Sequence, residues 1–197
     1  MPIVPIHPRP IVGRWLSGVA LDLHTTSSTA VGPNQFGHMQ FDTARPEIAE
    51  LLFRLKNRSD REAAESIIET AADYLAKYRS KFDVIIPVPP SQRRAVQPVI
   101  IVAEGIGRTL GLPVLSCIGT TRSTTQLKNV TDPEERKKHL EGLYTVNASE
   151  TRNLNVLLFD DLFRSGSTMN VITELLMTTG NAASVRALTI TKTRSNQ

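Results

Sequence analysis

The most informative stretch of the sequence reads Asn155-Val-Leu-Leu-Phe-Asp-Asp-Leu-Phe-Arg-Ser-Gly-Ser-Thr-Met169. Its apolar residues 156–159 predict a short buried strand, and the acidic pair Asp160 and Asp161 follows directly. Two more apolar residues lead into a polar loop at 164–168, after which the apolar spacing becomes that of a helix. The sequence therefore predicts a strand that ends in carboxylates and turns through a glycine-, serine- and threonine-rich loop into a helix.

This pattern combines two kinds of ligand contact at one place. The loop can offer hydroxyl groups and backbone N–H groups to a phosphate, and the helix N-terminus adds its partial positive charge. The carboxylates of Asp160 and Asp161 suit hydroxyl donors or a hydrated cation such as Mg²⁺. The alternative is an ordinary strand–turn–helix with a Ser or Thr N-cap and two exposed acids. We favour a sugar-phosphate site, because one such ligand would satisfy both halves of the pattern.

The stretch resembles the phosphoribosyl pyrophosphate (PRPP) binding motif of type I phosphoribosyltransferases, in which two acids lie between an apolar strand and a Thr-Thr-Gly-x-Thr-like loop. The resemblance implies that Asp160 and Asp161 hold the ribose hydroxyls and serve catalysis, with Mg²⁺ bound to them directly or through ligand or water. It also implies that five residues surround the 5′-phosphate: Arg164, Ser165, Gly166, Ser167 and Thr168. Arg164 departs from the commoner Thr, Asp or Ala at a position where the family is permissive. A side chain added at Gly166 is expected to fill the phosphate's place.

A second part of the site is expected after the apolar run at 82–88, whose β-branched residues predict a central strand that prolines end. A helix is predicted at 99–110, ended by Gly111. Ligands bind at the carboxyl ends of the strands in an open parallel sheet, so the loop between them should face the loop at 164–168. The resemblance implies that it receives the pyrophosphate, through Pro90, Ser91, Arg93 and Arg94. The alternative for the two arginines is a solvated loop.

A long polar segment, residues 121–142, lies between a strand predicted at 112–118 and the acidic motif. Long polar segments inside compact domains are commonly disordered or form active-site lids. Its pattern resembles the competence-protein-F-like branch of the family: Thr121-Arg122…Gln126-Leu127-Lys128…Glu135-Arg136…Leu140-Glu141-Gly142-Leu143-Tyr144. The resemblance implies a lid that brings Lys128, and secondly Arg122, to the pyrophosphate during catalysis. The alternative is a permanently ordered surface excursion.

The resemblance to this branch covers residues 45–192. The branch commonly carries an N-terminal zinc module rich in cysteine, which is missing here, because Cys117 is the only cysteine of the chain. Residues 1–12 are punctuated by prolines and predict an extended arm, and residues 14–41 predict a hairpin or small sheet. We interpret His24 and His38 as satisfied or exposed side chains rather than as metal ligands, since no cysteine or helical His spacing accompanies them.

Two helices are predicted next. Pro46 opens the first, whose apolar face carries Ile48, Leu51, Leu52 and Leu55. Ser59 and Glu62 form the pattern of a capping box for the second. The polar residues around the break are interpreted as a solvated connector: Lys56, Arg58 and Arg61.

We predict a three-layer α/β fold of the type I phosphoribosyltransferase kind, with a mainly parallel sheet. Its strands are expected near residues 82–88, 112–118, 156–160 and 185–191. Residues 1–80 would form an N-terminal hood of two covering helices and a small β-rich part. Residues 81–197 would form the phosphoribosyltransferase-like core.

The function that the resemblance implies is that of a cytoplasmic phosphoribosyltransferase, a pentosyltransferase of nucleotide metabolism. It would transfer the phosphoribosyl group of PRPP to a nitrogen nucleophile and release pyrophosphate, with Mg²⁺ as cofactor. The alternative is a non-catalytic PRPP-binding accessory or regulatory protein, linked to DNA uptake.

Composition restricts the partners further. A net charge of +4 is mild, and the basic segments also carry acids, so nucleic acid is not a favoured partner. No apolar run reaches the length of a membrane span, so no membrane partner is expected. A homo-oligomer is expected.

Overall fold

The computed structural model describes residues 2–90, 97–121, 140 and 142–194. A five-stranded sheet forms its centre, in the order β1-β2-β9-β8-β5. The strands are β1 (Arg9–Pro10), β2 (Gly18–Leu23), β5 (Val84–Pro87), β8 (Asn155–Phe163) and β9 (Ser184–Lys192). Only β1 runs antiparallel to its neighbour, whereas β2, β9, β8 and β5 are parallel to one another. The predicted mainly parallel α/β fold is confirmed.

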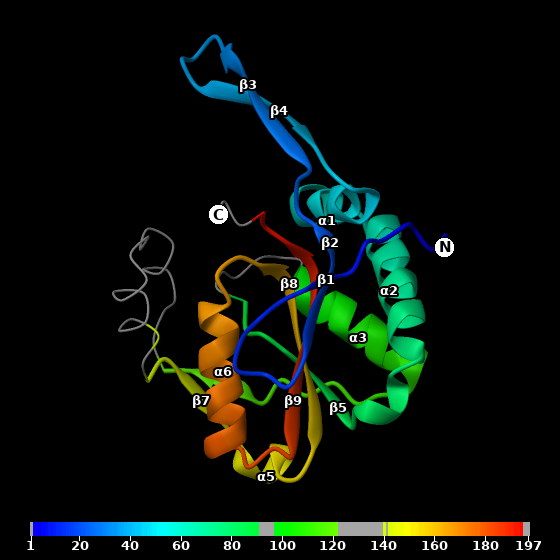
Figure 1. Ribbon diagram of the computed structural model, residues 1–197, viewed down its shortest axis with the longest axis vertical. Coiled ribbons are helices and arrows are strands. Elements are labelled where there is room, and N and C mark those ends of the chain that lie inside the picture. Colours follow the sequence, from blue (N-terminus) through cyan, green and yellow to red (C-terminus); the bar gives the residue numbers. More distant parts are fainter. Residues whose placement is uncertain (1, 91–96, 122–139, 141, 195–197) are drawn as a thin grey trace.

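Helices cover both faces of this sheet, as Figure 1 shows. One face packs against α1 (Glu47–Arg58), α2 (Arg61–Ala76) and α3 (Pro98–Leu110), and the other against α6 (Ser167–Thr178). Alternation along β8 supplies both cores, because Leu157 and Phe159 join the first cluster while Val156 and Leu158 join the second. The shorter helices are η1 (Arg79–Lys81) and α5 (Ala148–Thr151). None of the helices in the described part of the chain has the length and apolar character needed to cross a membrane.

The two N-terminal helices follow the predicted apolar spacing, but the junction between them differs by one residue. All four residues predicted for the buried face of α1 are buried: Ile48, Leu51, Leu52 and Leu55. The N-cap of α2 is Asp60 rather than Ser59, and its carboxylate accepts a hydrogen bond from the Ala63 amide at 3.0 Å. Ser59 instead ends α1 in the left-handed conformation, with φ of 52°, which removes it from the capping position.

The strand predicted at 112–118 is wrong. Only Val114 forms a bridge with Ile85, and the adjoining chain is held by two hydrogen bonds, Ile85 N to Pro113 O at 2.9 Å and Leu115 N to Ile85 O at 3.0 Å. Pro113 has no N–H to donate, which limits pairing at this edge of the sheet. The chain then forms β6 (Ile118–Thr120), which pairs with β7 (Tyr144–Val146) in a separate two-stranded sheet.

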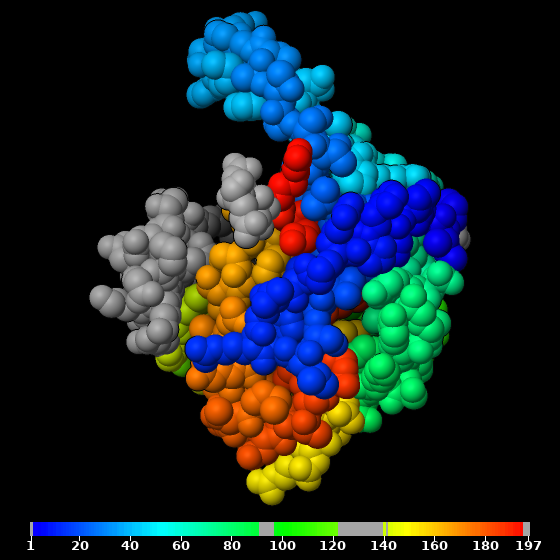
Figure 2. Space-filling model, viewed as in Figure 1, coloured from blue at the N-terminus to red at the C-terminus, as the bar shows by residue number. Residues whose placement is uncertain are grey.

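The N-terminal region contributes to the central sheet as well as covering it. β2 pairs with β9 in parallel, so part of the region expected to form a β-rich hood is a strand of the main sheet. The predicted hairpin forms from β3 (Ser27–Pro33) and β4 (Met39–Ala44), which stands clear of the body in Figures 1 and 2. Its register places four small or apolar side chains on one face: Ala30, Pro33, Met39 and Phe41. This hairpin rises from the same edge of the sheet as the carboxyl end of β2.

Candidate functional site

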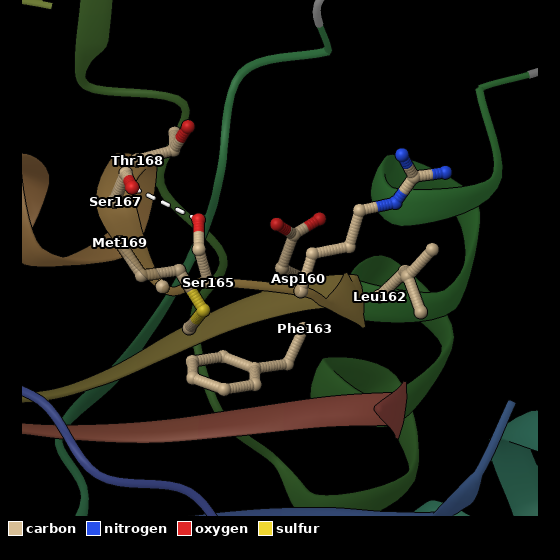
Figure 3. A pocket seen from close by; sticks show the side chains of 9 residues that line it. Asp160, Leu162, Phe163, Ser165, Ser167, Thr168 and Met169 are labelled. Carbon is tan, nitrogen blue, oxygen red and sulfur yellow. Dashed lines mark hydrogen bonds between the residues drawn. The ribbon is translucent and has the colours of Figure 1, made fainter. Parts of the chain in front are cut away.

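A pocket of about 120 Å³ lies where β8 turns into α6 (Figure 3). β8 does not stop at the acids, as the sequence suggested, but continues through them to Phe163, because Asp160 pairs with Thr189 and Phe163 with Lys192 of β9. All five residues predicted to surround the 5′-phosphate line this pocket together with Asp160. The complete lining is Asp160, Leu162, Phe163, Arg164, Ser165, Gly166, Ser167, Thr168 and Met169.

The loop presents hydroxyl groups and a helix N-terminus to this pocket. The hydroxyl groups of Ser165 and Ser167 lie 2.9 Å apart. Gly166 occupies the N-cap position of α6 in the left-handed conformation, with φ of 73°, and so provides no side-chain cap. The amides of the first helical turn have no partner within the helix, and the helix dipole makes this end favourable for an anion. The loop therefore has the donors that a phosphate requires.

The glycine has a different role from the one predicted. A Cβ atom at Gly166 would lie 2.7 Å from Phe163 Cε2 and 3.5 Å from Trp15 Cη2, so it would meet aromatic rings rather than occupy open phosphate space. The positive φ is a second reason for glycine here, because left-handed backbone is strained for most side chains. Gly166 thus allows the loop to pack closely on Phe163.

Arg14 and Trp15, just after the N-terminal arm, support this loop and α6, which the sequence did not indicate. Trp15 packs edge-on against Phe163, with ring centroids 6.1 Å apart and planes at 82°, and its indole N–H donates to Ile11 O at 3.1 Å. The Arg14 amide donates to Asn170 Oδ1 at 2.7 Å, and the Arg14 side chain forms an ion pair with Glu174, so α6 is held as well. The only local signal was the single tryptophan, which stands just after the proline-rich arm.

The two acids point to opposite faces of the sheet. Asp160 follows the alternation of Leu158, toward α6, and its carboxyl group faces the same pocket as the Ser165 hydroxyl (Figure 3). Asp161 follows Phe159, toward α1, and its Oδ1 lies 2.8 Å from Lys56 Nζ. Lys56, interpreted from the sequence as part of a solvated connector, is only 21% exposed in its side chain. The two acids are thus adjacent in sequence, but Asp160 faces the pocket whereas Asp161 faces Lys56.

These surroundings shift the protonation of Asp160. Burial and the neighbouring charge of Asp161 raise the pKa of the Asp160 carboxyl well above its usual range. The Asp161 amide, which donates to Asp160 Oδ1 at 2.8 Å, and the charge of Lys56 oppose this shift only in part. A cation or a set of hydroxyl donors at this position would favour the ionised carboxylate.

Four basic side chains lie near one another at this end of the sheet, and we call His24, Arg45, Lys56 and Arg164 the basic cluster. Lys56 contacts Asp161, whereas Arg164 also lines the pocket that Asp160 faces. Burial, followed by the charges of Lys56, Arg45 and Arg164, lowers the pKa of His24, and only Asp161 raises it. His24 was expected to be a satisfied or exposed histidine, and its Nδ1 indeed lies 3.1 Å from a hydroxyl, that of Thr191. Its place beside the acidic motif was not foreseen, because β2 was not expected to join the central sheet.

Part of the predicted site falls outside the residues that the structure describes. These are Ser91, Arg93, Arg94, Arg122 and Lys128. Pro90 is described and exposed, and the Val88 amide before it donates to Phe159 O at 2.8 Å. The chain entering the predicted pyrophosphate loop therefore runs beside β8, immediately before the acids.

The described side chains provide few ligands for a magnesium ion. The described residues hold no group of three or more His, Cys, Asp and Glu that could bind a metal ion. The available carboxylates are Asp160, which faces the pocket, and Asp161, which is paired with Lys56. This set fits Mg²⁺ only in the mode in which one or two carboxylates act together with water and substrate oxygens.

The fold and the site define an α/β protein with a hydroxyl-rich loop at a helix N-terminus and an acidic pair at the carboxyl edge of its sheet. The phosphoribosyl transferase domain family matches residues 59–197, and the chain belongs to this family. Competence protein ComFC of Bacillus subtilis (strain 168) is 27% identical over 151 residues, which cover 72% of this chain. The match spans 58% of that relative's length.

Solved structures agree with this fold. An adenine phosphoribosyltransferase from Trypanosoma brucei, solved with AMP, pyrophosphate and ribose 5-phosphate, matches 95% of this chain and 86% of its own, with a TM-score of 0.51 and 11% identity. A second adenine phosphoribosyltransferase matches 85% of this chain and 86% of its own, with a TM-score of 0.50 and 11% identity. At these identities the likeness is one of fold.

Proposed function

We propose that this protein is a phosphoribosyltransferase that transfers the phosphoribosyl group of PRPP to a nitrogen nucleophile. The observation that carries the proposal is that Asp160 and the loop residues 164–168 line one pocket at the end of β8. Membership of the phosphoribosyl transferase domain family and the ribose 5-phosphate bound by the Trypanosoma brucei relative support the same ligand. We further propose a cytoplasmic protein that acts as a homo-oligomer.

In the proposed complex the 5′-phosphate accepts hydrogen bonds from the loop amides at the start of α6 and from the hydroxyls of Ser165, Ser167 and Thr168. Asp160, facing the same pocket, accepts from the ribose hydroxyls. Asp161 stays bound to Lys56 or exchanges that partner for ribose when PRPP enters. Placing the sugar between these groups fixes its C1 atom above the carboxyl end of β8.

The reaction breaks the bond between C1 and the pyrophosphate oxygen, and the electron pair leaves with pyrophosphate. The nitrogen lone pair of the acceptor forms the new bond to C1, and the nitrogen then loses a proton to solvent. Bound Mg²⁺ would neutralise part of the pyrophosphate charge. Arg93, Arg94, Lys128 and Arg122 remain the predicted cationic contacts of the leaving group.

The alternative function is that of a PRPP-binding regulatory protein without transfer activity. Two observations favour it. A relative that is 27% identical is named as a competence protein. The ion pair with Lys56 also occupies Asp161, an acid that the transfer site would use. A link to DNA uptake belongs to this alternative. The two functions share the PRPP site and differ only in the chemistry that follows binding.

Two measurements on the full chain separate them. Calorimetry with PRPP and MgCl₂ should show binding that Asp160→Asn weakens by about 1–3 kcal/mol, the range for a lost charge-assisted hydrogen bond. Pyrophosphate release should then accompany the addition of ammonia, amines or nucleobases to the PRPP complex. Binding without release for every acceptor would favour the regulatory alternative, and absence of PRPP binding would exclude both.

A further inference from the structure

Resting on the proposed function, we infer that the acceptor binds against the basic cluster on the β2 side of the acids and carries a negative charge of its own, as a carboxylate or phosphate. The cluster draws on three parts of the chain that converge at the carboxyl edge of the sheet: the end of β2, the segment from β4 into α1, and the last turn of α1. Its members are His24, Arg45, Lys56 and, from the phosphate loop, Arg164.

The order of the strands determines which side of the sugar faces this cluster. β5 borders β8 on one side, and β9 followed by β2 borders it on the other. The predicted pyrophosphate loop begins at Pro90, just past β5, whereas His24 lies just past β2. The acids at the end of β8 therefore lie between the expected leaving group and the basic cluster.

Substitution at a sugar C1 atom places the incoming and departing groups on opposite faces of the ring. If the pyrophosphate departs on the β5 side, the nitrogen nucleophile must approach from the β9 and β2 side. The side chains on that side then contact the rest of the acceptor molecule. These side chains are the basic cluster, so its chemistry selects the acceptor.

The cluster holds more positive charge than its acids neutralise. Lys56 is paired with Asp161, and Arg45 NH1 lies 3.6 Å from Glu50 Oε2, a loose contact. The guanidinium of Arg45 also lies over the Phe53 ring, 4.7 Å from its centroid. Its Nε atom is buried, and no hydrogen-bond partner is found for it among the residues that the structure describes. The Arg45 side chain as a whole is 22% exposed, so a ligand oxygen can approach the accessible part of its guanidinium.

Two further observations agree with a positive site. Arg164 is exposed and adds its charge without an ion-pair partner among the described residues. Burial and, after it, the charges of these three cations lower the pKa of His24, which favours a neutral imidazole beside the Thr191 hydroxyl. Lys56 and Arg45 have acidic partners and Arg164 borders the phosphate loop, so a neutral heterocycle would leave only the excess positive charge of the cluster uncompensated. A carboxylate or phosphate on the acceptor would pair with that excess.

The test uses matched probes that differ in charge. With the full chain saturated by Mg²⁺ and ribose 5-phosphate, which cannot transfer, nicotinate is compared with nicotinamide and orotate with uracil. Proton NMR follows the His24 imidazole, and calorimetry measures affinity. We expect at least one anionic probe to bind about tenfold or more tightly than its neutral partner and to raise the pKa of His24, since it offsets the neighbouring cations.

Variants then assign the effect to the cluster. Lys56→Met and Arg45→Met should abolish the preference for the anionic probe, and Arg58→Met, which removes an exposed cation from the same last turn of α1, should keep it. Equal affinity for charged and neutral probes, or no binding by either anionic probe, would overturn the inference. Normal PRPP binding in that same preparation would show that the proposed function survives, and loss of PRPP binding would show that the proposed function itself has failed.

Discussion

Lys56 Nζ lies 2.8 Å from Asp161 Oδ1, and this contact joins the last turn of α1 to the acidic end of β8. Both side chains are largely buried, with exposed fractions of 21% and 16%. The pair holds the covering helix over the carboxyl edge of the sheet. It also gives Asp161 a cationic partner, whereas no described residue forms an ion pair with Asp160.

Breaking this pair should destabilise the protein. Lys56→Met leaves the Asp161 carboxylate largely buried without its partner, and we expect a loss of about 1–3 kcal/mol in the free energy of unfolding, between the values for exposed and fully buried pairs. Asp161→Asn added to Lys56→Met should recover part of that loss, because no charge is left unpaired. Urea unfolding of the two single variants and the double variant measures the coupling. Strictly additive losses would mean that the contact contributes nothing.

The raised pKa of Asp160 predicts how stability depends on pH. The folded chain keeps this proton to a higher pH than the unfolded chain, whose carboxyl titrates near about 4. The free energy of unfolding of the ligand-free protein should therefore fall as the pH rises above the unfolded pKa. The loss should be complete once the pH has passed the raised pKa of Asp160. Asp160→Asn removes the charge, so its stability relative to the parent should be greater at about pH 9 than at about pH 5.

Asp83 offers a control of opposite sign. Hydrogen bonds from the Asn155 amide and side chain lower the pKa of Asp83. The stability that the ionised Asp83 carboxylate contributes is fully present above the pKa of an unfolded carboxyl group. It is lost as the pH falls through the lowered pKa of Asp83 in the folded protein. Thermal unfolding should thus show Asp83→Asn losing stability at neutral pH, where Asp160→Asn gains it. The same direction for both variants would contradict the assigned surroundings of Asp160.

Gly166 should tolerate no side chain. Gly166→Ala combines a positive φ with a Cβ atom 2.7 Å from Phe163, so both loop packing and PRPP affinity should suffer. Gly37→Ala is a matched control, because its φ is 78° and nothing lies within 4 Å of its Cβ position. Each variant carries the backbone strain of about 1 kcal/mol, and only the first carries the clash. Equal unfolding free energies for the two would show that Phe163 can move aside at no cost.

Trp15 should matter for the phosphate loop although it lies outside the pocket lining. Trp15→Ala removes a buried indole from beneath Phe163 and should cost about 3–5 kcal/mol. Leu16→Ala, at a neighbouring side chain that is 68% exposed, should change stability little. Urea unfolding tests both. A loss of affinity for PRPP in Trp15→Phe, which retains an aromatic ring, would further show that the arm positions the loop.

Local patterns in the sequence predicted the elements that local interactions determine. The apolar run of β8, the loop and α6 follow one another within a few residues, and each has its own signal. The buried face of α1 was predicted from spacing alone. The capping residue was missed by one position, because whether Ser59 or Asp60 caps α2 depends on the left-handed turn that ends α1.

Contacts between distant segments were not predictable in this way. Nothing near Lys56 in the sequence indicates that its side chain meets Asp161 at the end of β8. Nothing near Trp15 indicates that it packs against Phe163. The pairing of β2 with β9 joins the two ends of the chain, so neither strand's own residues specify it. The prediction of a strand at 112–118 was wrong because it rested on a local apolar pattern. Whether that segment joins the sheet depends on pairing with the distant β5, which Pro113 limits to the bridge between Val114 and Ile85.

A crystal structure of the full chain with PRPP and MgCl₂ tests the proposed site most directly. The prediction is that the 5′-phosphate lies within hydrogen-bond distance of the amides at the start of α6 and of the Ser165 or Ser167 hydroxyl, with the ribose hydroxyls on Asp160. PRPP bound elsewhere, with this loop free of phosphate, would contradict the proposal.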